Sequence, residues 1–414
     1  MMGPGYATLA WRNIWRNRRR TLITLFGMSF GVLLAVVFMG MGDSSYGAMI
    51  DHSARLGSGH VIVQHAGYQD APNLKKSVGD VSKVIESAEA TPNVERAVAR
   101  ISGAGLVATA TSSQGTSFIA VDPAAEDEAT MALVDSVAEG EMLSDAQGNG
   151  MLLGAGLAKA LGVSLGKKVV FTATDRNGEI VSALARVKGI IVTGSPSLDR
   201  NLCVLPIDSA RETLGYGPQD ATQVAVFVAD HRTSGEVAAA LRPGLASDAV
   251  ALTWAEASPE LAGLIAIDRA GAIAFEIIVM LLLAASVFNT IFQSVMERTR
   301  EFGIMAALGY SRGSLFAIVM WESLWVALTG LVVGALVTAW PYYYLATEGL
   351  NYAELAGEGQ EFGGVAMDPI LYVGIYAQSV AAIVIAVVLA TLLAGLYPAW
   401  RAGRINPADV IRQQ

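Results

Sequence analysis

The run GVSLGKK, residues 162–168, is the stretch of this chain that comes nearest to a catalytic motif. A phosphate-binding loop has the spacing G-x-x-x-x-G-K-[ST], in which backbone N–H groups and the lysine hold the phosphates. Here Leu161 stands at the first glycine position and Lys168 at the Ser/Thr position. The spacing therefore fails, and we expect neither nucleotide binding nor ATP hydrolysis by this chain.

Metal ligation and nucleophilic catalysis find no better support. The four histidines are His52, His60, His65 and His231, and no H-E-x-x-H or carboxylate triad accompanies any of them. Ser197 and Asp199 lie in TGSPSLDRN without a G-x-S-x-G elbow. Cys203 is the only cysteine, so it can form no intrachain disulfide and is expected in the core. The sequence thus predicts no catalytic, cofactor or metal site, and a chain that is not itself an enzyme.

A compact charged strip, ERTREFGIMAALGYSR, fills residues 297–312 between two long apolar runs. A helix there would present apolar side chains that can enter a groove on a partner protein, with charged side chains at its rim. The apolar residues are Phe302, Ile304, Met305 and Leu308, and the charged ones are Glu297, Arg298, Arg300 and Glu301. A plain cytoplasmic loop would explain the arginines but not the apolar residues behind them, so we favour the docking helix.

The composition indicates a chain that is part membrane and part aqueous. Its 53% hydrophobic residues and mean hydropathy of +0.46 are high for a soluble protein, and its 16% charged residues are too many for one that lies wholly in lipid. The net charge of −9 argues against nucleic acid as a partner.

Four runs are long enough to cross the hydrocarbon of a bilayer, which takes about 20 helical residues. They are assigned to residues 21–42, 269–296, 313–340 and 369–400. Arginines cluster before the first run, between the second and third, and after the fourth, whereas residues 341–368 contain no lysine or arginine. By the positive-inside rule the ends of the chain and residues 297–312 are cytoplasmic, and residues 43–268 and 341–368 lie outside. The first run is expected to stay as an anchor, since GMGDSSYGAM lacks a signal-peptide cleavage site.

The two ends of the chain are expected to differ. Residues 1–20 place Ala7, Trp11, Ile14 and Trp15 at helical spacing among arginines, which is typical of a helix in the membrane interface. Ordinary juxtamembrane anchoring would look much the same. Residues 401–414 form a short basic tail.

The large outer segment has an α+β pattern. Strand, helix and strand signals follow one another in residues 59–102, and the same order recurs in residues 222–254. We predict one split lobe from residues 43–110 and 216–258, with a β-rich insert at 111–215. From about Pro259 a continuous helix is expected to run through the second span.

Two features inside the spans concern helix contacts. Gly27 with Gly31, and Gly330 with Gly334, have the small-xxx-small spacing that permits close approach, either within the chain or to a second copy. Glu322 stands inside the third span, roughly 10 Å deep at about 1.5 Å per residue. We expect it to form an ion pair with an arginine from the first or last elbow, the alternative being that it snorkels to the interface.

Three motifs resemble the cytoplasmic signatures of the MacB-like family of ABC transporter permeases, which carry an FtsX-like permease domain. They are YATLAWRNIWRNRRRTLIT, MERTREFGIMAALGYSRGSL and YPAWRAGRINPADVIR. LGSGHVIVQHAGYQD is similar to the lipoprotein-releasing LolC/LolE-type branch, and MLLGAGLAKALGVSLGKKVVFTA resembles the family's outer domain. The resemblance covers nearly the whole chain in the expected order.

The resemblance implies an α+β membrane protein with one span, an outer domain of two lobes (porter and sabre), and three more spans. It implies a bacterial inner-membrane permease subunit that works by mechanotransmission, with residues 297–312 as the coupling helix. The implied partners are a separate ABC ATPase subunit that holds ATP and magnesium, a second permease copy or a paralogue, and membrane lipid.

Three functions stay open at this stage. Release of lipoproteins or other lipid-anchored cargo is favoured by GSGHVIVQHAGY. The alternatives are a MacB-type drug or peptide efflux permease and a non-transporting regulator of periplasmic hydrolases.

Overall fold

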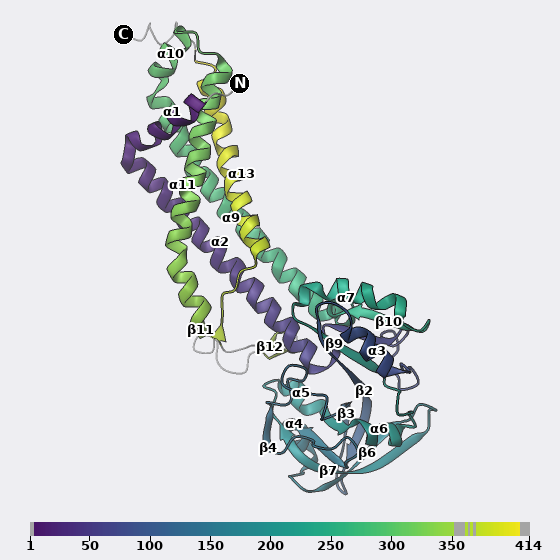
Figure 1. Ribbon diagram of the computed structural model, residues 1–414. Helices are drawn as coiled ribbons and strands as arrows, with labels where there is room; N and C mark the ends of the chain where they lie inside the picture. Colours follow the sequence, from purple (N-terminus) through teal and green to yellow (C-terminus); the bar gives the residue numbers. More distant parts are fainter. Residues whose placement is uncertain (1–3, 352–360, 363–364, 367–369, 406–414) are drawn as a thin grey trace. The chain divides into compact units, whose positions relative to one another are not determined.

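The computed structural model describes residues 4–351, 361–362, 365–366 and 370–405 (Figure 1). Most of the predicted outer loop and residues 406–414 of the predicted tail lie outside the described residues. The chain divides into two compact units. The helical unit comprises Met1–Ser45, Ile267–Asn351 and Ile370–Gln414, and the mixed α/β unit comprises Tyr46–Ala266 and Tyr352–Pro369.

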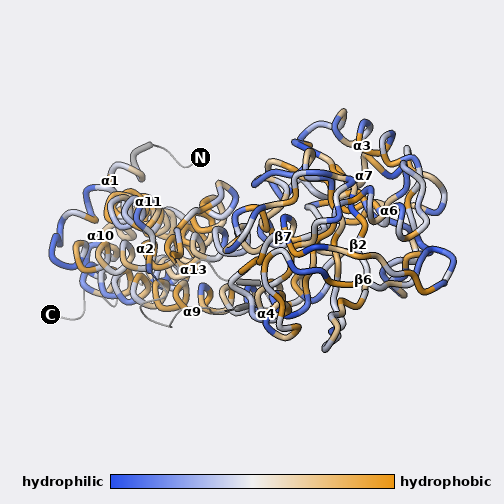
Figure 2. Tube along the Cα trace, turned by 90° about the horizontal axis from the view of Figure 1, so that it is seen from below, coloured by the Kyte–Doolittle hydropathy of each residue, from blue (hydrophilic) through white to orange (hydrophobic). Residues whose placement is uncertain are grey.

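Four long helices dominate the helical unit and each is long and apolar enough to cross a membrane. They are α2 (Arg18–Ser53), α9 (Pro259–Glu297), α11 (Arg312–Thr347) and α13 (Ala377–Ala402). Figure 2 shows the hydrophobic colour running along these helices and the hydrophilic colour gathering at the end where α10 lies. The continuous helix expected from about Pro259 is confirmed by the bounds of α9.

Short elements complete the helical unit: α1 (Pro4–Ile14), a 3-10 turn η1 (Trp15–Asn17), α10 (Thr299–Ala307) and the strand pair β11 (Leu350–Asn351) with β14 (Ile370–Leu371). Helix α1 lies against α11, where the indole N–H of Trp325 donates to the carbonyl of Ala7 at 3.0 Å and the ring of Trp11 packs edge-on 5.0 Å away. Asp43 near the end of α2 accepts hydrogen bonds from the Tyr376 N–H (3.1 Å) and the Ser379 hydroxyl (2.6 Å). This carboxylate therefore caps the first turn of α13, where free N–H groups favour an anion.

The α/β unit is built on a ten-stranded sheet in the order β10-β1-β9-β2-β3-β8-β5-β7-β4, with β6 pairing β2 and β7. The strands are β1 (Val61–His65), β2 (Val94–Ala108), β3 (Ser113–Val121), β4 (Val137–Gly140), β5 (Gly150–Gly154), β6 (Lys168–Thr174), β7 (Ile180–Ile191), β8 (Leu202–Pro206), β9 (Gln223–Val228) and β10 (Ala249–Thr253). Only the β3–β8 and β5–β7 pairs are parallel among these strands. A further short pair joins β12 (Glu361–Phe362) to β13 (Val365–Ala366).

Helices of the α/β unit cover this sheet. They are α3 (Val81–Glu89), α4 (Ala155–Leu161), α5 (Pro196–Asn201), α6 (Ile207–Leu214), α7 (Ser234–Leu241) and α8 (Trp254–Ala257), with short turns η2 (Ala54–Ser58), η3 (His231–Thr233) and η4 (Arg242–Gly244). The main apolar core lies between strands and helices and is centred on fully buried residues such as Phe118, Leu153 and Val226. The mixed α and β structure expected of the large segment between the first two long helices is thus confirmed.

The two strand-helix-strand segments predicted from the sequence interleave in the sheet. Strand β1 lies between β10 and β9, and β9 lies between β1 and β2, so each segment supplies a strand to the middle of the other. Strand β2 is shared: its first half pairs β9, and residues 101–108 pair β3. The long β2 therefore joins this part of the sheet to the strands of residues 111–215.

Candidate functional site

Helix α10 follows α9 and precedes α11 in the chain, and Figure 1 shows it at one end of the helical unit, near α1. It follows the end of α9 after Arg298 and is closed by Gly309, whose φ of 96° lies in the left-handed region that glycine adopts without strain. The hydroxyl of Ser311 then accepts from the Ser314 N–H at 3.2 Å and caps α11. Both ends of the predicted coupling segment are thus fixed by local turn chemistry.

Glu322 is paired, as expected, but with a different arginine. Arg298 Nη1 donates to Glu322 Oε1 at 2.6 Å, and Asn13 Nδ2 donates to the same oxygen at 2.7 Å. The Arg298 and Glu322 side chains are only 8% and 6% exposed. The expectation that the partner would come from the first or last elbow, and that Arg298 would lie exposed at a rim, is therefore wrong. Arg298 directly follows α9 and turns inward, where the unpaired carboxylate would be costly.

Ion pairs at the surface extend this buried pair. Arg298 Nε donates to Glu301 Oε2 at 3.0 Å, and Arg16 Nη1 donates to Glu301 Oε1 at 2.7 Å. Arg20 Nη1 donates to Glu297 Oε2 at 3.0 Å. Partial burial raises the pKa of Glu301, but hydrogen bonds from Arg298 and Arg16 outweigh it and hold that pKa below its ordinary value.

We call the linked groups Asn13, Arg16, Arg298, Glu301 and Glu322 the elbow network. It joins α1 and η1 to α10 and α11, all within the helical unit. Movement of α10 would therefore displace groups on three other elements.

Phe302 does not form a surface anchor. Its side chain is fully buried in the apolar cluster that also contains Val295, Leu315 and Ala399, and the Arg298 guanidinium lies 5.1 Å from its ring centroid. The prediction that Phe302 enters a partner's groove is wrong, because this chain's own helices already cover it. Met305 packs partly against the same cluster.

Arg300 and Ile304 of α10, and Leu308 at the C-cap of this helix, are spaced four residues apart on its outward side. Ile304 is 53% exposed and Leu308 is 75% exposed. We call these three residues the α10 patch. Glu297 and Glu301 are also about half exposed, but arginines of this chain hold their carboxylates, so among the residues predicted to meet a partner the α10 patch supplies the exposed aliphatic groups.

The four glycines with small-xxx-small spacing, Gly27, Gly31, Gly330 and Gly334, pack against other helices of the same chain. A Cβ on Gly330 would meet Met28 Cε at 2.5 Å, and one on Gly334 would meet Val32 Cβ at 2.9 Å. A Cβ on Gly31 would lie 3.2 Å from Leu283 Cδ1 of α9, and one on Gly27 would lie 3.7 Å from Ser286 Oγ. Both spacings therefore let α2 lie close to its neighbours in the same chain.

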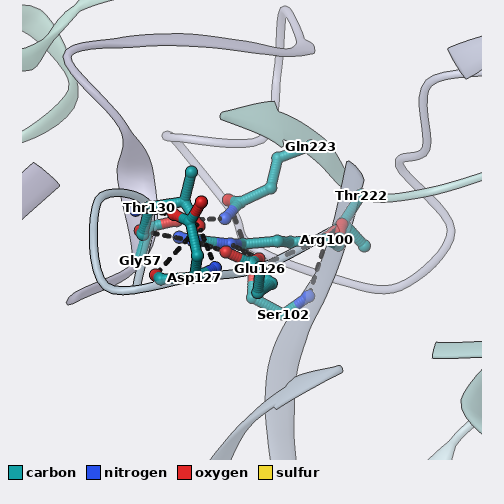
Figure 3. A network of polar contacts seen from close by, with 8 residues as sticks. All are labelled: Gly57, Arg100, Ser102, Glu126, Asp127, Thr130, Thr222 and Gln223. Carbon is teal, nitrogen blue, oxygen red and sulfur yellow. Dashed lines mark hydrogen bonds and ion pairs between the residues drawn. The ribbon is translucent and has the colours of Figure 1, made fainter. Parts of the chain in front are cut away.

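The α/β unit contains a buried ion pair that the sequence analysis did not identify (Figure 3). Arg100 Nε and Nη2 donate to the two oxygens of Glu126 at 2.7 and 2.8 Å, and Nη2 also donates to the Thr130 carbonyl at 2.8 Å. Both charged side chains are 1% exposed. Beside them Gln223 Nε2 donates to the carbonyl of Gly57 at 2.8 Å, in the turn that follows α2. The sequence did contain a signal of this buried pair, since Arg100 interrupts the largely apolar run AVARIS at residues 97–102.

Three residues that were considered in the search for catalytic motifs, Gly162, Gly166 and Cys203, have structural roles. Among the described residues there is no group of three or more His, Cys, Asp and Glu side chains placed to hold a metal ion. Gly162 and Gly166 form left-handed turns between α4 and β6. Burial of Cys203 in β8 raises the pKa of its thiol to about 12, so this thiol is neutral and covered.

Two protein families match this chain and together span most of it. The MacB-like periplasmic core domain matches residues 21–243, and the FtsX-like permease C-terminal domain matches residues 273–407. The first covers the α/β unit up to α7, and the second covers α10, α11 and α13.

Relatives with curated names are similar at low identity. The lipoprotein-releasing system transmembrane protein LolE of Haemophilus influenzae is 22% identical over 97% of this chain and 98% of its own length. LolC of Xylella fastidiosa is 23% identical over 68% of this chain and 67% of its own. The pyoverdine export ATP-binding/permease protein PvdT of Pseudomonas entomophila is 27% identical over 98% of this chain but 59% of its own length.

Proposed function

The chain belongs to the MacB-like, FtsX-like family of ABC transporter permeases, and from this premise we propose that it is a mechanotransmission subunit for lipoprotein release. ATP hydrolysis in a separate ATPase subunit moves α10, the helical unit carries that movement, and the outer domain extracts lipid-anchored proteins. The permease resides in the bacterial inner membrane with both termini in the cytoplasm, and it acts beside a second copy or a paralogue.

The α10 patch is the observation that carries this proposal. Two large aliphatic side chains, Ile304 of the nine-residue helix α10 and Leu308 at its C-cap, are exposed near the exposed cation Arg300. Exposed aliphatic groups rimmed by charge are the pattern of a helix that docks into a groove on another protein. The ATPase subunit is the partner proposed for this groove.

The elbow network supports transmission beyond the patch. The Arg298 side chain is held both by Glu301 of α10 and by Glu322 of α11, so α10 cannot tilt without moving a buried charge pair. Interactions of this kind resist rearrangement because a separated buried ion pair is costly. A displacement of α10 is therefore transmitted to α1 and α11 through these contacts.

The outer domain is the proposed working end, comprising residues 43–268 in two lobes. The Gln223–Gly57 hydrogen bond fixes the turn after α2 to strand β9, and the Arg55 Nη1 donates to the Glu128 carbonyl at 3.4 Å. These contacts support the view that displacement of α2 would reach the Arg100–Glu126 pair and the segment around it.

Lipid-anchored proteins are proposed as cargo because LolE, which matches 97% of this chain over 98% of its own length, and LolC are both named for lipoprotein release. Efflux is the second candidate. It is favoured by PvdT, which has the higher identity of 27% and is named for pyoverdine export.

A reconstituted system separates the two candidates. The chain, its ATPase subunit and a lipid-anchored reporter protein are placed in proteoliposomes, and the reporter that appears in the soluble fraction is measured with and without ATP. We expect ATP-dependent release of the reporter and no release of a matched reporter that has a transmembrane helix instead of acyl chains. Transport of a small soluble substrate without reporter release would support efflux and overturn the lipoprotein assignment.

A further inference from the structure

The α/β unit contains a cavity of about 690 Å³ that none of the features above uses. It lies along β2 and β3, under the segment between β1 and α3, and beside α5. Its volume is in the range of a small-molecule site, which is typically about 300–1,000 Å³. All its lining residues belong to this one unit.

The walls of this cavity are mainly apolar. Leu56, Leu74, Phe118, Ile119, Leu198 and Leu202 contribute to them. The floor is made of small residues, since Ala104 of β2 and Ser117 of β3 are paired across the strands and both are exposed to the cavity. Small side chains opposite large aliphatic ones leave a hollow in which an apolar chain can lie.

Polar groups in the lining are largely engaged by the fold itself. The Tyr68 hydroxyl donates to the Ser102 carbonyl at 2.9 Å. Asp175 accepts from the Asn177 and Glu179 N–H groups, each at 2.8 Å, and so closes its own turn. A bound peptide would bring N–H and C=O groups that need partners, and this wall offers few. An acyl chain has no such requirement.

Lys75 is the one cationic side chain in the lining. It is exposed, and none of the described carboxylates forms an ion pair with its ammonium group. The neighbouring Lys76 differs, because its Nζ donates to the carbonyls of Gly67 and Ala71 at 2.6 and 2.9 Å. The Lys75 ammonium can therefore donate to an oxygen at the head of a bound ligand.

We infer that this cavity binds a long-chain acyl group, with its chain against the leucine and isoleucine wall and its carbonyl or carboxylate oxygens at Lys75. The inference deepens the proposed function, since lipid-anchored cargo carries such chains. It can fail separately, because binding is measured without ATP and without an ATPase subunit.

Photolabelling of the full-length chain in lipid nanodiscs tests the site. The probe is dodecanoate with a diazirine at the far end of its chain, and labelled peptides are identified by mass spectrometry. We expect label on peptides containing residues 102–104 or 117–119. Ala104→Trp and Ser117→Trp, which fill the cavity, should each reduce that label by about tenfold, because the bound chain and the indole compete for one volume.

Control variants keep the result specific. Ser113→Trp lies on the same strand but outside the lining and should label like the unsubstituted chain. Lys75→Met should raise the half-saturating dodecanoate concentration by about tenfold, the loss expected for one charge-assisted hydrogen bond, whereas Lys167→Met should leave it unchanged. Protection of Cys203 from maleimide reports that each variant is folded.

Competition identifies the source of the acyl group. Displacement of the probe by a triacylated lipopeptide assigns the site to cargo anchors, and displacement by free fatty acid alone assigns it to fatty acids; both outcomes support the site. Label confined to the long helices would overturn the inference. Equal labelling of the folded Ala104→Trp and Ser117→Trp variants and the unsubstituted chain would also overturn it.

Discussion

Arg298 is the residue on which most of the elbow network depends. Its guanidinium donates to Glu322 and Glu301 and lies over the ring of Phe302, so one side chain joins a buried carboxylate, an exposed one and an apolar core. A buried carboxylate that loses its arginine keeps only the hydrogen bond from Asn13. Arg298 therefore contributes to the folding stability of this chain, whether or not α10 binds a partner.

Arg298→Ala should lower the thermal stability of the detergent-solubilised chain, by about 3 kcal/mol, the usual cost of removing one partner from a buried ion pair. Adding Glu322→Gln should restore most of that loss, since the charge left without a partner is then removed. Arg300→Ala, at an exposed position, should change stability by less than about 0.5 kcal/mol. Equal melting temperatures for Arg298→Ala and Arg300→Ala would show that the buried pair does not form.

The lowered pKa of Glu301 predicts an acid-sensitive elbow network. A carboxyl group whose pKa is lower in the folded state contributes stability above its unfolded pKa, and this contribution is lost as the pH falls through the folded pKa. Melting temperatures should therefore decline below about pH 4.5, the ordinary range of a glutamate. Glu301→Gln should show a shallower decline than the unsubstituted chain, and identical curves would refute this role for Glu301.

The sequence could locate Glu322 but not its partner. A single charge in an apolar run is visible in the sequence, and the need to pair it follows from its cost in a low-dielectric environment. Which arginine reaches it depends on how α9 ends and where α1 lies, and these are tertiary facts. Phe302 illustrates the same limit: helical spacing separates it from Ile304, but only the packed bundle determines which of the two faces is covered.

At the scale of elements, close contact between α2 and α11 depends on two glycines. Gly330 and Gly334 receive Met28 and Val32 at distances that leave no room for a Cβ. Their spacing predicted close helix approach correctly, but it could not distinguish a contact within one chain from a contact between copies.

Gly334→Leu should destabilise the chain itself by roughly 1–3 kcal/mol, the range for overpacking a close contact. Gly271→Leu is the matched control, because it lies in α9 and a Cβ there meets nothing within 4 Å. Thermal unfolding of both variants in detergent measures the difference. If Gly334→Leu unfolds like Gly271→Leu, the two helices do not pack as described.

Strands were easier to predict than the sheet they form. The apolar, β-branched runs of β1, β9 and β10 are a local signal, and all three strands lie within the two segments predicted to have strand-helix-strand order. Their interleaved order comes from pairing between segments more than 100 residues apart, which no local pattern contains. The Arg100–Glu126 pair depends on this order, since β2 must lie beside β9 before Arg100 can be covered.

In the mechanism proposed above, α10 is the input of a lever that ends in the α/β unit. In this mechanism, movement passes from the helical unit to the α/β unit along α2 and α9, because each helix contains residues of both units. The elbow network passes movement from α10 to α1 and α11 within the helical unit. The central claim is that an ATPase subunit holds the α10 patch. Phe302→Asp would not test this, because burying a charge in the helical cluster would damage the permease itself.

The most direct test is a detergent pull-down of the ATPase subunit by Ile304→Asp and Leu308→Asp variants. Ile180→Asp serves as control, since Ile180 is 79% exposed on β7 of the α/β unit. We predict loss of the ATPase subunit from both α10 variants at normal permease level and melting temperature, a weakening of about 2 kcal/mol or more for each buried aliphatic anchor that becomes charged. The Ile180→Asp chain should retain the subunit. Full retention of the ATPase subunit by the folded Ile304→Asp and Leu308→Asp variants would contradict the coupling role of α10.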